Sequence, residues 1–113
     1  MEKFMYLFVE DATQAGQASP EEMQAGMQKW FDWIDKLKAT NQYESGEPLL
    51  PSGKIIKGAN KVVTDGPFAE SKELVSGYFI VLAKDLDHAT KMAMDCPIFE
   101  MGGDLVVRPV QKF

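Results

Sequence analysis

The chain has 113 residues, the usual length of one domain, which buries about two-thirds of its unfolded surface in a single core. Hydrophobic residues make up 45% and charged residues 26%, which are ordinary globular values and exclude a largely disordered chain. The formal charge is −5 and no basic cluster exceeds two residues, so we expect no nucleic acid partner and no binding to anionic membranes. The sequence therefore predicts one domain over residues 1–113.

The first predicted element is a strand at residues 4–9, a short run that is apolar on both faces and rich in aromatic side chains. Such a strand belongs in the centre of a sheet. The run is shorter than the hydrophobic region of a signal peptide, and Glu10 and Asp11 follow it instead of a cleavage site. We therefore expect a cytoplasmic protein.

A helix is predicted from Pro20 to about Ala39. Ser19 is suited to cap its first turn, Pro20 fits the first helical position, and Glu22 completes a capping box. Helical spacing places five apolar residues on one stripe that should pack on the sheet, with Phe31 and Trp33 at its flanks. The stripe consists of Met23, Met27, Trp30, Ile34 and Leu37.

Two further strands and a small insertion follow the helix. A broken strand is predicted at residues 43–50, and the apolar pairs at 55–56 and 62–63, separated by glycine, indicate a hairpin insertion. The strongest strand signal covers residues 77–83, again apolar on both faces. We expect this strand to pair with residues 4–9 in the middle of the sheet.

The C-terminal part predicts a second helix and a last strand. Asp85 is the expected N-cap, and the helix should reach Cys96, where Pro97 stops it. The last strand covers residues 104–110, and its proline at position 109 requires a sheet edge. Because the chain holds one cysteine and one histidine, it cannot assemble a zinc or iron–sulfur site, and we expect no metal and no cofactor.

The order of the predicted elements defines the fold class. Strand, helix, strand, hairpin insertion, strand, helix and strand form an α+β, ferredoxin-like split βαβ arrangement. Both helices of this topology lie on one side of the sheet, so the apolar side chains of the other side need a cover. A second copy would provide it by isologous contact, which predicts a homodimer whose two sheets form a dimeric α+β barrel.

Residues 63–78, VTDGPFAESKELVSGY, closely resemble the signature of the YCII-related family, in the branch named for its Asp-Gly-Pro-Phe (DGPF) sequence. The resemblance continues through residues 85–87, 96–97 and 107–110, and so covers nearly the whole chain. It implies a dimeric α+β barrel. It also implies two kinds of role, because some members belong to dehydrochlorinase-type enzymes and others are associated with extracytoplasmic-function sigma factors.

This sequence departs from the enzyme-like members at one point. The resemblance implies a histidine near the start of the first helix, paired with an aspartate, but that helix opens SPEEMQ here. The sole histidine, His88, belongs to the second predicted helix and is expected at the surface. Any catalysis must therefore use other groups.

Asp65 and Glu70 are the candidate catalytic residues. A rigid turn at residues 65–68 could hold the Asp65 carboxylate beside a pocket, and a second carboxylate nearby would allow the two to divide acid and base roles. The alternative is structural: Asp65 accepts backbone hydrogen bonds, glycine and proline set the turn, and Phe68 fills the core.

Four residues are candidates for binding a ligand or a partner: Phe68, Lys72, Trp33 and Arg108. Phe68 would supply an aromatic wall, and Lys72 could hold an anionic group or belong to a solvated loop. Trp33 could line a pocket or an interface, or pack at the rim of the helix. Arg108 could pair across the dimer, pair with a pocket carboxylate, or form a surface salt bridge.

Two functions are consistent with these residues. The first is a metal-free enzyme of the lyase or dehydrochlorinase type, acting on a small organic molecule through carboxylate acid–base chemistry. The second is a non-catalytic dimeric module that binds a small molecule or assists a transcription regulator.

Overall fold

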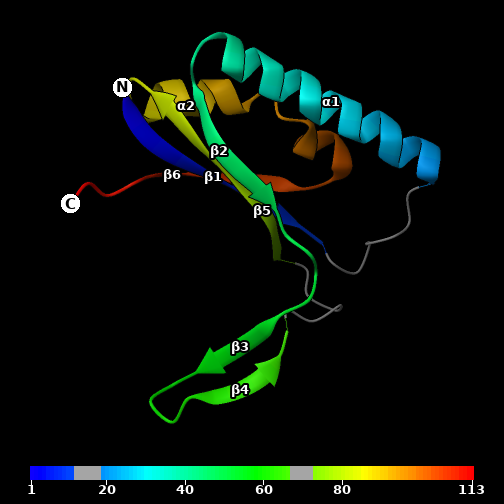
Figure 1. Ribbon diagram of the computed structural model, residues 1–113, viewed down its shortest axis with the longest axis vertical. Helices are drawn as coiled ribbons and strands as arrows, with labels where there is room; N and C mark the ends of the chain where they lie inside the picture. The colour runs from blue at the N-terminus through cyan, green and yellow to red at the C-terminus, as the bar shows by residue number, and fades with distance from the viewer. Residues whose placement is uncertain (12–18, 67–72) are drawn as a thin grey trace.

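The computed structural model describes residues 1–11, 19–66 and 73–113. Its main sheet is antiparallel with the strand order β2-β5-β1-β6, and two helices cover one side of it (Figure 1). The four strands are β1 (Glu2–Glu10), β2 (Tyr43–Pro48), β5 (Leu74–Ala83) and β6 (Asp104–Pro109). The two strands with continuous apolar runs are the inner pair, as the sequence predicted, and the fold is the expected α+β, ferredoxin-like arrangement.

Helix α1 (Pro20–Ala39) begins at the predicted cap, where the Ser19 hydroxyl accepts a hydrogen bond from the Glu22 backbone N–H at 3.1 Å. Helix α2 (Leu86–Ala93) begins in the same way, because the Asp85 carboxylate accepts from the His88 N–H at 2.8 Å. Each cap satisfies one of the N–H groups that a helix start leaves without an intrahelical partner. The local sequence therefore fixes where both helices begin.

The core lies between the sheet and the two helices. Alternate residues of β1, namely Phe4, Tyr6 and Phe8, are buried and pack with side chains of both helices, which places α1 and α2 on the same face. The Tyr6 hydroxyl donates a hydrogen bond to the Ala89 carbonyl oxygen at 2.5 Å and so ties the central strand to α2. The helix side chains of this core are Trp33, Leu37, Ala89 and Ala93.

The predicted apolar stripe of α1 is only partly correct. Met23 and Met27 are 57% and 56% exposed, whereas Trp33, expected at the flank, is buried together with Leu37. All buried residues of α1 lie in its second half, and the first turns of the helix extend past the strands in Figure 1. The periodicity identified a helix correctly, but the sheet is too short to cover its whole length.

The second helix ends earlier than predicted. Helix α2 stops at Ala93, and a 3₁₀ helix, η2 (Pro97–Met101), follows it. Cys96 caps η2, because its sulfur accepts a hydrogen bond from the Ile98 N–H at 3.4 Å. Pro97 occupies the start of this new helix, a position at which its missing N–H is harmless.

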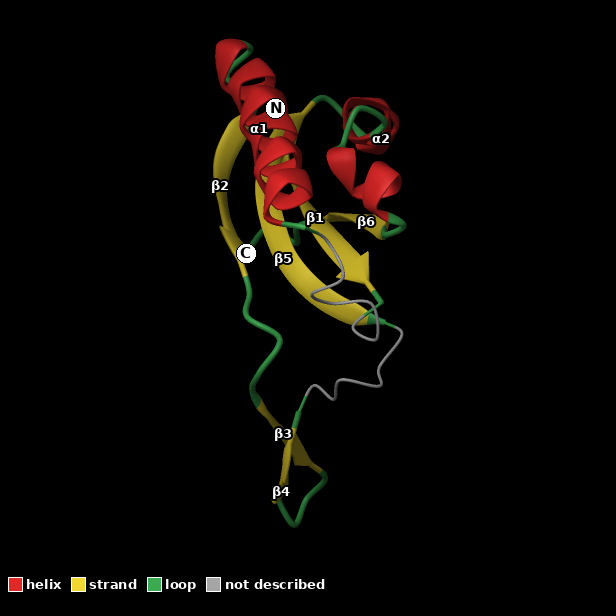
Figure 2. Ribbon diagram, turned by 90° about the vertical axis from the view of Figure 1, so that its right-hand side faces the viewer, coloured by secondary structure: helices red, strands yellow, loops and turns green. Residues whose placement is uncertain are grey.

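The predicted insertion forms a separate two-stranded sheet, β3 (Lys54–Lys57) paired with β4 (Val62–Asp65). Figures 1 and 2 show this hairpin standing away from the main sheet, beyond the end where β2 stops and β5 begins. We call it the arm.

The face of the main sheet opposite the helices is apolar and has no layer over it within the described residues. Met5 and Leu7 of β1 lie on this open face, directly beside Ile80 and Tyr78 of β5. Each of these four side chains is half-buried even though no helix packs on it. None of the helices in the described part of the chain is long and apolar enough to cross a membrane.

Candidate functional site

Asp65 is the last residue of β4 and lies opposite Lys54, the first residue of β3. The Asp65 carboxylate and the Lys54 ammonium form an ion pair in which the two side chains are 82% and 66% exposed. A backbone hydrogen bond from the Gly66 N–H to the Gly53 carbonyl oxygen, 3.0 Å long, closes the hairpin beside them. Among the described residues the partner of Asp65 is therefore a lysine side chain, which sequence reasoning did not identify.

The pairing of the arm also decides what surrounds this ion pair. Side chains two residues apart on a strand share a face, so Ile56 and Val63, which lie opposite each other, project on the same side as Lys54 and Asp65. Both apolar side chains are exposed. The carboxylate thus stands next to an uncovered apolar pair. The other side of the arm carries Ile55, Lys57, Val62 and Thr64.

Three of the predicted site residues, Phe68, Glu70 and Lys72, lie outside the described residues. The proposed pairing of Asp65 with Glu70 is therefore not described.

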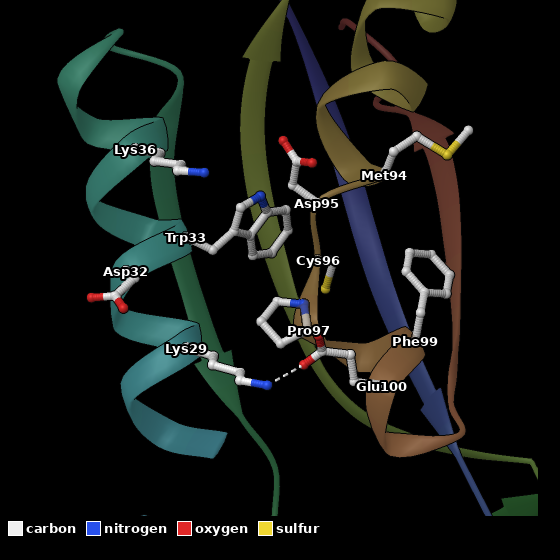
Figure 3. Close-up of a pocket in the computed structure, with 10 residues that line it drawn as sticks. All are labelled: Lys29, Asp32, Trp33, Lys36, Met94, Asp95, Cys96, Pro97, Phe99 and Glu100. Atoms are coloured by element: carbon white, nitrogen blue, oxygen red, sulfur yellow. Dashed lines mark hydrogen bonds and ion pairs between the residues drawn. The ribbon is translucent and has the colours of Figure 1, made fainter. Parts of the chain in front are cut away.

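Trp33 is only 4% exposed and belongs to the core. Its ring stacks on Phe79, with a centroid separation of 5.5 Å, and lies 6.0 Å from the ring of Tyr6. The same residue forms part of the wall of a cleft of about 410 Å³ between α1 and the segment that follows α2 (Figure 3). Trp33 thus combines core packing with a position at a hollow surface.

The cleft is charged on both walls. Lys29 and Lys36 approach it from α1, and Asp95 and Glu100 from the other side, with the Lys29 Nζ 2.8 Å from a carboxylate oxygen of Glu100. The i, i+3, i+7 spacing of Lys29, Asp32 and Lys36 places them on one helix face. The wall of the cleft opposite α1 is formed by residues 94–100. Their position follows from the path of the chain after α2, which no local sequence pattern predicts.

Cys96 lies at the base of this cleft and is buried. Burial raises the pKa of its thiol to about 12, so the neutral thiol predominates at physiological pH. Cys96 is therefore a buried packing residue. No group of three or more His, Cys, Asp or Glu side chains that could hold a metal ion occurs in the described part of the chain.

Arg108 lies on the edge strand β6, directly opposite Met5, and shares the open sheet face with it. Its side chain is exposed. The arm, the open face and the cleft are therefore three separate places, and the predicted site residues that the structure describes are distributed over all three. One protomer does not gather them around one pocket.

The chain belongs to the YCII-related domain family, whose sequence pattern it matches over residues 4–113. Among solved structures it is similar to 5-chloro-2-hydroxyhydroquinone dehydrochlorinase from Burkholderia phenoliruptrix AC1100, in complex with 2,5-dihydroxybenzoquinone, with a TM-score of 0.53 and 16% sequence identity. The alignment covers 98% of this chain and 95% of the dehydrochlorinase, and at that identity the likeness shows the fold. No sequence among curated proteins matches the chain.

Proposed function

We propose that this YCII-related protein is a homodimeric, metal-free lyase of the dehydrochlorinase type, in which Asp65 acts as the general base. The observation that carries the proposal is the side-chain ion pair of Asp65 with Lys54 at the end of the arm. A carboxylate at this position, beside an ammonium and next to apolar side chains, is a group that can accept a proton from a bound substrate.

The chemistry that fits this arrangement is a base-assisted elimination from a small ring compound. The carboxylate takes a proton from a carbon or hydroxyl group of the substrate, the electrons of the broken bond form a new double bond, and the leaving group departs from a neighbouring carbon with its bonding pair. No oxidant is consumed. Glu70 remains the candidate for the acid that assists the leaving group, and Phe68 and Lys72 remain candidates for holding the ring and an anionic substituent.

The dimer is part of the proposal. The open face of the sheet presents Met5, Leu7, Tyr78 and Ile80 without a covering layer in the described residues. Two such faces packed by two-fold symmetry would bury these side chains and close the barrel. Arg108, at the edge of the same face, would then lie near the interface.

The test is chloride release from 5-chloro-2-hydroxyhydroquinone by the purified protein in the presence of a metal chelator. We expect turnover by the wild type, a loss of at least about 100-fold in Asp65→Asn, and no change in Asp35→Asn, which alters an exposed carboxylate of α1. The melting temperature and dimer of Asp65→Asn should be measured alongside. A fall in stability that accounts for the lost turnover would assign Asp65 a structural role instead.

One observation favours a non-catalytic binding module as the second candidate. The Asp65 side chain is 82% exposed in one protomer, whereas the reacting groups of an enzyme usually lie in a concave pocket. This alternative predicts that 2,5-dihydroxybenzoquinone binds in a calorimetric titration without any turnover of the chlorinated compound. The absence of both binding and turnover would contradict this class of ligand for either candidate.

A further inference from the structure

The arm has no supporting helix or strand among the described residues of its own chain. Strands β3 and β4 pair with each other, and neither has more than marginal contact with another described helix or strand. An isolated two-stranded hairpin is at best marginally stable in water. The radius of gyration is 15.6 Å, whereas a compact domain of this length has a value of about 13 Å. The arm therefore needs a surface that residues 1–11, 19–66 and 73–113 of this protomer do not supply.

The accessible surface of the chain is larger than that of a compact monomer of the same mass, as expected for one protomer of a dimer. One chain has an accessible surface of 8212 Å², compared with about 6,200 Å² for a compact monomer of this mass. The excess, about 2,000 Å², is of the size that each protomer of an obligate dimer buries. Part of the uncovered apolar surface lies on the arm, where Ile56, Val62 and Val63 are exposed, and part lies on the open face of the sheet.

The path of the chain directs the arm away from its own sheet. The last backbone tie of the β2 edge is the hydrogen bond from the Leu49 N–H to the Ser76 carbonyl oxygen, 2.8 Å long. Residues 50–53 then lead to β3, and Figure 2 shows the hairpin continuing beyond the end of the sheet. A linker of four residues spans at most about 14 Å. It leaves the hairpin little length with which to reverse onto the open face of its own protomer.

Charge favours a second copy as the surface that receives the arm. Residues 54–65 contain three lysines and one aspartate, a net charge of +2. The remainder of the chain has nine cationic and sixteen anionic side chains, a net charge of −7. Opposite net charges attract at an interface and steer association, so the arm of one copy is complementary to the body of another.

We propose that, in the face-to-face dimer, the Ile56–Val63 side of the arm docks on a second copy at the margin of its open sheet face, beside the contact between the two sheets, and carries the Lys54–Asp65 pair into a site shared by two chains. The inference rests on the proposed function, because it supplies the enclosed setting that the Asp65 base lacks in one protomer. Ile56, Val63, Lys54 and Asp65 project from the same side of the hairpin, so the apolar contact cannot form without bringing the ion pair to the interface.

The shared site defines a role for Lys54 and a class of ligand. Water excluded by the apolar contact no longer screens the two charges, which strengthens every interaction that they make. The Lys54 ammonium can then bind an oxyanion of a small organic acid or phenol while the neighbouring carboxylate exchanges a proton. Arg108 and Tyr78, both on the open face, are the polar groups of the partner best placed to meet the ligand.

The experiment is photo-crosslinking with p-benzoylphenylalanine in place of Val63, and in place of Val62 as the matched control on the opposite side of the same strand. Unlabelled and ¹⁵N-labelled protein are mixed and allowed to exchange subunits, irradiated, and analysed by mass spectrometry. We expect the Val63 probe to give mixed light–heavy pairs that map to β1 and β5, and the Val62 probe to give markedly fewer.

Crosslinks of the Val63 probe that join only light to light and heavy to heavy chains, in a sample that sediments as a dimer, would overturn the docking of the arm and leave the dimer intact. Equal mixed crosslinking by both probes would also overturn it, because the docked side would then be undefined. A monomer in the same sedimentation run would contradict the dimer of the proposed function itself.

Discussion

Ile56 and Val63 face each other directly across the β3–β4 hairpin, and their side chains are 67% and 59% exposed. A cross-strand apolar pair stabilises a hairpin by a few tenths of a kcal/mol to about 1 kcal/mol, which is too little to hold an isolated arm. Its main contribution is therefore expected in the assembled dimer.

Replacing Val63 with Asn should weaken the dimer. Burial of a valine side chain contributes about 1.5–3 kcal/mol, and each dimer would hold two copies, so we expect the dissociation constant to rise at least about tenfold. Val62→Asn makes the same change on the opposite side of β4 and should leave the constant nearly unchanged. Sedimentation velocity over a dilution series measures both, and equal effects of the two variants would show that the arm has no docked side.

The Lys54–Asp65 pair should likewise depend on the dimer. An exposed ion pair contributes about 0–1 kcal/mol, whereas truncating one partner of an ion pair buried in an interface costs about 2–5 kcal/mol. Lys54→Ala should therefore raise the dissociation constant at least about tenfold. Lys57→Ala, on the other side of the arm, is the control. If Lys54→Ala raises the dissociation constant no more than Lys57→Ala does, the Lys54–Asp65 pair is exposed to solvent in the dimer.

The buried thiol of Cys96 predicts a loss of stability in alkali. Burial raises the pKa of Cys96 from 9.0 to about 12, so the folded state favours the neutral thiol and the unfolded chain ionises first. The contribution to the free energy of unfolding is complete below pH 9.0 and is lost as the pH rises toward about 12. Urea unfolding at about pH 8 and about pH 10.5 should show a smaller decrease for Cys96→Ala than for the wild type. An identical decrease would mean that the thiol is not protected.

Two glycines should respond in opposite ways to alanine. A Cβ atom on Gly26 of α1 would meet nothing within 4 Å, so Gly26→Ala should stabilise the protein by about 0.5–1 kcal/mol. A Cβ atom on Gly103 would lie 2.7 Å from a side-chain carbon of Ile98 and 2.8 Å from the Val9 carbonyl oxygen, and Gly103→Ala should destabilise it by about 1–3 kcal/mol. Thermal unfolding measures both. Destabilisation by Gly26→Ala would indicate that another backbone approaches α1 at this point in the dimer.

The fold could be predicted because its determinants are local. Ser19 and Asp85 carry the side-chain oxygens that cap the helices, and the uninterrupted apolar runs of β1 and β5 identify the central strands. The two strands of the insertion, β3 and β4, could be recognised from their short apolar pairs and from the glycine between them. Each of these signals lies within a few residues of the element that it specifies.

The site could be predicted only in part, because it depends on contacts distant in sequence. Asp65 was identified from a turn signature, but its partner Lys54 follows from the register of the hairpin. The burial of Trp33 and the exposure of Met23 depend on how far the sheet extends beneath α1. The charged cleft requires the path of the chain after α2. The periodicity of the sequence does not specify the hairpin register, the extent of the sheet beneath α1 or the path of the chain after α2.

The proposed dimer requires that a second copy of the chain cover the open face of the sheet. Sedimentation equilibrium of the wild-type protein at micromolar concentration tests it most directly. We expect a mass of about 25 kDa, twice the 12.6 kDa of one chain. A mass of 12.6 kDa that persists across the concentration range would contradict it.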